Sequence, residues 1–291
     1  MTAAARMPAA LAATLWMTGA IASFSTMAVA GRELAGRHDV FEILGYRSVV
    51  GWALVIGFGL ACGRLAEART GCLRVHLLRN TAHFAGQSLW FFAIPLIPLA
   101  QLFAIEFTTP LWVALLAPLV LGEGWTRARL AAAGLGFLGV LVVARPGLTP
   151  VDIGHIATLV AAICFAANVM VTKILSRTET VWTIMFWMTA MQAIFGLALA
   201  GADGAIALPT AETAGWLVLV GIGGLTAHLC IASALSLAPA SVVSPMDFLR
   251  LPVIAVVGMA LYGEPLEIAV FAGAALILAG NFVNIRAGGR A

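Results

Sequence analysis

Two acidic residues, Glu106 and Asp247, lie inside long apolar stretches of the sequence. A charged side chain is costly in hydrocarbon, so acidic residues in such stretches commonly mark the paths of ions, protons or ligands. A carboxyl group in that setting can accept a proton or bind a cation, and this is the chemistry we expect of Glu106 and Asp247. For Glu106 the alternative is a neutral, hydrogen-bonded group or an ion pair across helices.

The two acids occupy equivalent places in a repeated pattern. Segment Pro98–Glu123 aligns without gaps on segment Pro239–Glu264. The matched positions are Pro98 with Pro239, Glu106 with Asp247, Phe107 with Phe248, and Gly122-Glu123 with Gly263-Glu264. Apolar residues match by chance, but Pro, acid and Gly-Glu in one register indicate an internal duplication. Glu123 and Glu264 end apolar segments, and we expect them to be turn or capping groups.

Arg250 follows Asp247 by three residues, so the two share one face of a predicted helix. Arg250 could pair with a ligand carboxylate while Asp247 receives an ammonium group or a proton. A self-neutralising structural pair is the alternative. Glu106 has no charged neighbour on its own helix, and its candidate partners across helices are Arg47 and Arg250.

A polar stripe is predicted on the helix that carries His83, Gln87 and Trp90, because these residues recur at spacings of four and three. Such a stripe fits the wall of a cavity for an amphipathic organic ligand, or else hydrogen bonds between helices. Trp16 and Trp112 fall within apolar segments and could stack on a planar ligand, although tryptophan also packs against lipid.

The elements that must position these residues are membrane-spanning helices. The chain has 291 residues, of which 62% are hydrophobic and 10% charged, and its apolar stretches have the length that spans a bilayer as a helix. Lipid leaves backbone groups no water to bond, and continuous apolar runs without alternation exclude a barrel. We predict ten spans, at about 8–30, 40–62, 76–96, 98–121, 127–144, 152–173, 181–200, 213–237, 240–262 and 266–285.

The duplication predicts two five-helix repeats, at residues 1–146 and 147–291, around a central cavity. Because five is odd, the second repeat must enter the membrane with the opposite orientation, which makes the repeats inverted. Prolines within the fourth and ninth spans are candidate hinges or static kinks: Pro110, Pro118, Pro245 and Pro252. The GxGxxG pattern at 134–139 lies inside a span, so a nucleotide site is not indicated, and small residues there instead permit close helix packing.

The basic residues predict the orientation of the chain in the membrane. With both termini in the cytoplasm, eleven of the sixteen Lys and Arg residues lie inside. Arg32, Arg37 and Arg145 then lie outside, and Arg47 and Arg250 are embedded. We therefore expect a multi-pass protein of a bacterial-type inner membrane with both ends cytoplasmic. The net charge of +3 reflects this topology and indicates no nucleic-acid partner.

These features resemble the drug/metabolite transporter superfamily, specifically its EamA-domain branch, over nearly the whole chain. The resemblance implies a carrier with a central cavity that works by alternating access. From the embedded acids and Arg250 we expect a secondary transporter that exports an amphipathic, amino-acid-like metabolite. The alternative is an importer of a cofactor, vitamin or nucleoside-like compound.

Other classes remain in competition with a carrier, namely an intramembrane enzyme that uses His83 and His228, or a membrane scaffold. No catalytic motif supports the enzyme. The expected partners are a small-molecule substrate and the bilayer, with proton coupling through Glu106 and Asp247. We expect no cofactor or metal, and a monomer or weak homodimer.

Overall fold

The computed structural model describes residues 9–120, 126–145, 150–202, 204–237, 243 and 246–288. Over these residues the regular structure is helical, and the one bridge of strand type joins Ala35 to His38. The helices are α1 (Ala9–Leu34), α2 (Val40–Ala61), η1 (Leu65–Ala68), α3 (Leu73–Ala93), α4 (Leu99–Glu106), α5 (Thr109–Val120), α6 (Arg127–Ala144), α7 (Ile153–Leu175), α8 (Val181–Ala200), α9 (Ala214–Leu237), α11 (Arg250–Tyr262) and α12 (Ile268–Gly288).

Seven helical stretches in the described part of the chain are long and apolar enough to cross a membrane. They are Leu11–Leu34, Val40–Ala61, Leu99–Val120, Arg127–Ala144, Ile153–Leu175, Val181–Ala200 and Ala214–Ala234. The other three predicted spans correspond to α3, α11 and α12. Helix α3 is long enough but carries buried polar side chains, including Arg79 and Asn80, and the apolar parts of α11 and α12 are shorter.

Both acidic residues lie at helix breaks. The predicted fourth span is divided into α4, which ends at Glu106, and α5, which begins at Thr109. Pro110 is the second residue of α5, where its missing N–H group costs no helical hydrogen bond. Asp247 lies three residues before α11 begins, and Pro252 occupies the first turn of that helix. Pro245 lies outside the described residues.

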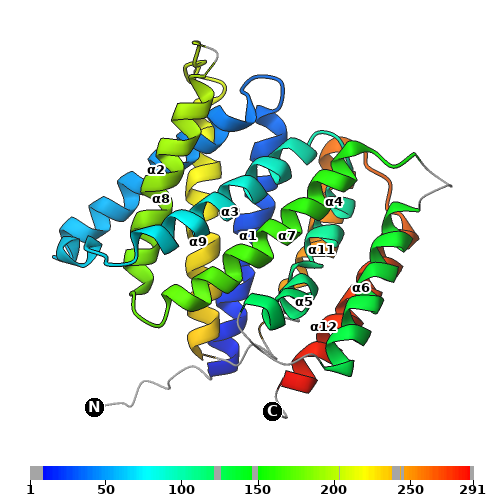
Figure 1. The fold of residues 1–291 in the computed structure, drawn as a ribbon. Coiled ribbons are helices and arrows are strands. Elements are labelled where there is room, and N and C mark those ends of the chain that lie inside the picture. The colour runs from blue at the N-terminus through cyan, green and yellow to red at the C-terminus, as the bar shows by residue number, and fades with distance from the viewer. Residues whose placement is uncertain are drawn as a thin grey trace, which may run out of the picture.

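Each helix packs mainly on a partner from the other half of the chain. Helix α1 packs on α9, α3 on α7, α2 on α8, and α6 on α12 (Figure 1). Glycines permit two of these contacts, because a Cβ atom added to Gly196 would lie 2.6 Å from the Cα of Gly45, and one added to Gly139 would lie 2.6 Å from the carbonyl oxygen of Gly273. Small residues let helix backbones approach closely in this way.

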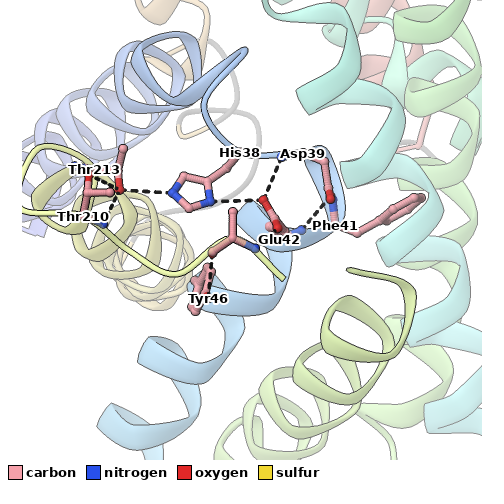
Figure 2. A network of polar contacts seen from close by, with 8 residues as sticks. His38, Asp39, Phe41, Glu42, Tyr46, Thr210 and Thr213 are labelled. Carbon is pink, nitrogen blue, oxygen red and sulfur yellow. Dashed lines mark hydrogen bonds and ion pairs between the residues drawn. The ribbon is translucent and has the colours of Figure 1, made fainter. Parts of the chain in front are cut away.

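Polar side chains tie together the end of the bundle where α1 ends and α2 begins. Asp39 and Glu42 form a capping box at the start of α2, and His38 bonds both Glu42 and Thr213, at 3.1 Å each (Figure 2). Glu42 also accepts from the backbone N–H of Ala207 in the segment before α9. The start of α2 is thereby held to the connection between α8 and α9.

A second set of bonds at this end, here called the Arg32 latch, consists of Arg32, Ile94, Ile97, Leu99 and Glu264. The guanidinium group of Arg32 pairs with the carboxylate of Glu264 and donates to the carbonyl oxygens of Ile94 and Ile97. Glu264 Oε2 also accepts from the backbone N–H of Leu99, at 2.9 Å. The latch thus joins α1, the α3–α4 connection and the turn after α11.

The Gly-Glu pair at this turn has a physical basis. Gly263 ends α11 in the left-handed conformation, at φ +66°, which glycine adopts without steric cost. The side chain of Glu264 caps the start of α4, which belongs to the other half of the chain. The predicted capping role is therefore carried out between the two halves. The equivalent pair, Gly122-Glu123, lies outside the described residues.

Candidate functional site

A cavity of about 370 Å³ lies between the two halves of the chain. Helices α1 to α5 contribute to its wall from the first half, and α7, α9, α11 and the turn before α11 contribute from the second. Its volume is at the lower end of the range for small-molecule sites. Six phenylalanine and tryptophan rings line it: Phe24, Trp90, Phe91, Phe107, Phe165 and Phe248.

Glu106, Asp247 and Arg250 form one charged cluster in this wall. Arg250 Nη2 lies 3.1 Å from Asp247 Oδ2 and 3.4 Å from Glu106 Oε1. The side chain of Arg250 is 4% exposed, whereas those of Glu106 and Asp247 are 17% and 25% exposed. All three side chains line the cavity, and the two carboxylates are more exposed than the arginine.

Aromatic rings hold the cluster in place. The guanidinium carbon of Arg250 lies 4.4, 4.9 and 5.0 Å from the ring centroids of Phe24, Phe103 and Phe107, within the range of cation–π attraction. Trp90 Nε1 donates to Glu106 Oε2 at 2.8 Å. The repeat-related rings of Phe107 and Phe248 contact each other, with centroids 4.5 Å apart.

A second polar chain runs through another part of the wall. Arg47 Nη1 donates to Gln87 Oε1, and Gln87 Nε2 bonds His83 Nε2. His83 in turn contacts His228, with ring centroids 5.9 Å apart. Arg47 is 8% exposed and has no carboxylate within ion-pair distance among the described residues. Glycine at 224 makes room for its guanidinium group, because an added Cβ atom would lie 2.7 Å from Nε.

The structure brings six of the eight predicted site residues to this cavity: His83, Gln87, Trp90, Glu106, Asp247 and Arg250. The other two lie elsewhere. Trp16 is 43% exposed on α1, and Trp112 lines a separate, apolar pocket beside α6, where it donates to Thr108 Oγ1 at 3.2 Å. Of the two arginines considered as partners for Glu106, Arg250 is the one in contact.

Sequence reasoning did not single out most of the aromatic wall. Phe107 and Phe248 were detectable, because they match in the repeat and directly follow the two acids. Phe24 and Phe165 carry no such signal among the fifteen phenylalanines of the chain. The described residues include no group of three or more His, Cys, Asp or Glu side chains that could hold a metal ion.

Comparison with known proteins agrees with this architecture. The sequence model of the EamA-like transporter family matches residues 11–145 and again residues 152–286. A solved crystal structure has a TM-score of 0.65 to this chain at 20% identity, covering 96% of this chain and 98% of that one, which shows a shared fold.

Named relatives are bacterial transporters. A riboflavin transporter of Brucella anthropi is 29% identical over 281 residues, covering 93% of this chain and 97% of that protein. A riboflavin transporter of Rhizobium johnstonii is 30% identical over 222 residues, covering 76% of this chain and 73% of that protein. An S-adenosylmethionine uptake transporter of Rickettsia bellii is 22% identical over 263 residues, covering 90% and 89%.

These are membrane transporters and not enzymes, which agrees with the absence of a catalytic motif in the sequence. With two matches that together cover most of its length, the chain belongs to the EamA-like transporter family, a group of multi-pass membrane transporters of small molecules.

Proposed function

We propose that the protein is a secondary transporter for the uptake of a cofactor-type solute with a flat ring system, and that riboflavin is the first candidate. The observation that carries the proposal is the aromatic wall of the cavity, because planar rings stack favourably on aromatic side chains. Relatives named as riboflavin transporters, one of them aligned over 97% of its length, support the same choice.

Uptake of a cofactor is better supported than the export of an amino acid. For an amino-acid ligand, Arg250 was the candidate partner of the ligand carboxylate. In the structure Glu106 and Asp247 already occupy its Nη2 atom, and three phenyl rings pack against its guanidinium group. A relative named as an S-adenosylmethionine uptake transporter also favours uptake.

We further propose the inverted arrangement of two five-helix repeats with ten spans and cytoplasmic termini. The packing of α1 on α9 and of α3 on α7 supports it, because exchanging the two halves converts each of these pairs into the other. The pairs α2 with α8 and α6 with α12 are each converted into themselves. A pseudo-two-fold axis through the cavity would have this effect.

Glu106 and Asp247 are the proposed coupling residues. Two carboxylates share one guanidinium group, so the fully ionised cluster carries one excess negative charge in a low-dielectric site. A proton or the solute itself can neutralise that charge. In this scheme protonation and solute binding alternate with the movement of the two discontinuous helices.

S-adenosylmethionine is a second candidate because of a specific feature of the wall. Its sulfonium cation would be attracted by carboxylates and by the faces of aromatic rings, and both are present around Glu106 and Asp247. A relative named as an S-adenosylmethionine uptake transporter aligns over 90% of this chain.

The test is solute counterflow in proteoliposomes that contain the purified protein. Vesicles preloaded with riboflavin should accumulate labelled riboflavin. Vesicles preloaded with S-adenosylmethionine or with an amino acid should not accumulate the labelled form of the same solute. The variants Glu106→Gln and Asp247→Asn should fold and lose accumulation driven by a proton gradient. Transport of an amino acid in place of either cofactor would refute the proposal, and wild-type activity of both variants would refute the coupling assignment.

A further inference from the structure

We infer that the cavity favours solutes that carry hydrogen-bond donors or positive charge and rejects those that carry an additional anionic group. A phosphorylated flavin is then excluded, whereas the free vitamin binds. The inference rests on the proposed function and specifies the chemical class of the substrate.

Four charged side chains line the cavity, and the carboxylates of Glu106 and Asp247 are more exposed than the guanidinium groups of Arg47 and Arg250. Glu106 and Asp247 keep a part of their side chains exposed, whereas Arg250 is almost wholly buried. Asp247 Oδ1 and the side-chain oxygen of Asn168 have no hydrogen-bond partner among the described residues. Both atoms are acceptors, so they fit hydroxyl, ring N–H or cationic groups of a solute.

The cations of the wall are already engaged. Arg250 Nη2 contacts both acids, and its unpartnered Nε and Nη1 groups lie among the rings of Phe24, Phe103 and Phe107. N–H groups interact weakly but favourably with such rings.

Arg47 is the remaining cation of the lining, and it is 8% exposed. Its Nη1 group donates to Gln87, and its Nε and guanidinium carbon lie against α9 at Gly224, where an added Cβ atom would be 2.7 Å and 2.9 Å away. The side of the guanidinium group that faces α9 is thereby closed to an anionic ligand, and Nη1 is engaged by Gln87. An incoming phosphate would instead meet the excess negative charge of the acid cluster in a site of low dielectric, where repulsion is strong.

The experiment measures equilibrium binding of three flavins to the purified wild-type protein by quenching of flavin fluorescence. The probes are riboflavin, its 5′-acetate and its 5′-phosphate, and the neutral ester separates bulk from charge. We expect the acetate to bind within about threefold of riboflavin and the phosphate at least tenfold more weakly.

The double variant Glu106→Gln with Asp247→Asn should reduce the difference between riboflavin and its phosphate to about threefold or less. Glu212→Gln is the matched control, since Glu212 lies on an exposed surface with a side chain 80% accessible. This control should keep the wild-type ratio. The wild-type comparison stands by itself if the double variant does not fold.

Two results would overturn the inference while leaving the proposed function intact. If the 5′-phosphate binds as tightly as riboflavin, the two acids do not exclude anions. If neither the 5′-acetate nor the 5′-phosphate binds, the size of the added group, and not its charge, limits binding. Failure of all three flavins to bind would instead reject the flavin assignment, and the inference with it.

Discussion

Removing the positive charge of Arg250 should destabilise the protein more than removing any exposed arginine. The substitution Arg250→Met keeps an apolar stem against the three phenyl rings but leaves Glu106 and Asp247 without a cation within ion-pair distance among the described residues. Breaking a buried ion pair from one side costs about 3–5 kcal/mol, because the remaining charge is desolvated without compensation.

The expected loss is readable as a melting temperature. For a domain of this size, about 3–5 kcal/mol corresponds to a decrease of roughly 10 °C. The assay is thermal unfolding of the detergent-solubilised protein, followed by tryptophan fluorescence. Arg74→Met is the matched control, because Arg74 is exposed at the start of α3, and its melting temperature should stay within about 2 °C of wild type.

A triple variant separates charge imbalance from loss of packing. Replacing Glu106, Asp247 and Arg250 by Gln, Asn and Met removes all three charges together, and neutral replacement of a buried ion cluster is often without net cost. The triple variant should therefore recover most of the stability and remain inactive in counterflow. If Arg250→Met melts like wild type, or if the triple variant is no more stable than the single one, the reasoning about the cluster is wrong.

Three further substitutions test separate contacts. Gly139→Ala should lower stability by about 1–3 kcal/mol, because the added methyl group would be overpacked against α12. Gly134→Ala on the same helix meets no atom within 4 Å and should be neutral or stabilising. Thermal unfolding measures both effects, and equal effects would contradict the proposed packing of α6 on α12. Trp90→Phe removes the hydrogen bond to Glu106 and should weaken flavin binding about tenfold or more, because a hydrogen bond to a charged group contributes about 1.5–3 kcal/mol. Trp112→Phe is the control and should leave flavin binding unchanged. A larger loss of binding from Trp112→Phe than from Trp90→Phe would refute the site. Glu264→Gln weakens the Arg32 latch and should speed solute exchange at that end of the bundle. The rate of counterflow measures this exchange. A rate equal to that of the wild type would mean that the latch does not limit exchange.

The sequence was sufficient to predict the charged cluster because its members are rare. Few acidic residues occur in the apolar stretches, and the internal duplication related Glu106 to Asp247 directly. The stripe of His83, Gln87 and Trp90 was predictable from helical spacing alone, and all three residues border the cavity. A polar group in lipid needs a partner, so its presence already indicates an interior position.

Other features depend on contacts between distant segments and left no local signal. Trp16 and Trp112 were indistinguishable from cavity residues, because tryptophan packs equally well against lipid and against other helices. Pro110 marked an interruption, but the sequence did not show that α4 would end at Glu106 itself. The partner of Glu264 was equally out of reach, since Arg32 lies in the other half of the chain.

The Arg32 latch has a consequence for how the two broken helices can move. Glu264 follows α11, and it holds the backbone of Leu99 at the first residue of α4. The helix that ends in one acid is thus fastened to the helix that begins beside the other. A tilt of α11 that starts at Asp247 must therefore either carry α4 with it or first break the bond between Glu264 and Leu99. This bond would link the positions of the two acids through the backbone, in addition to their shared contact with Arg250.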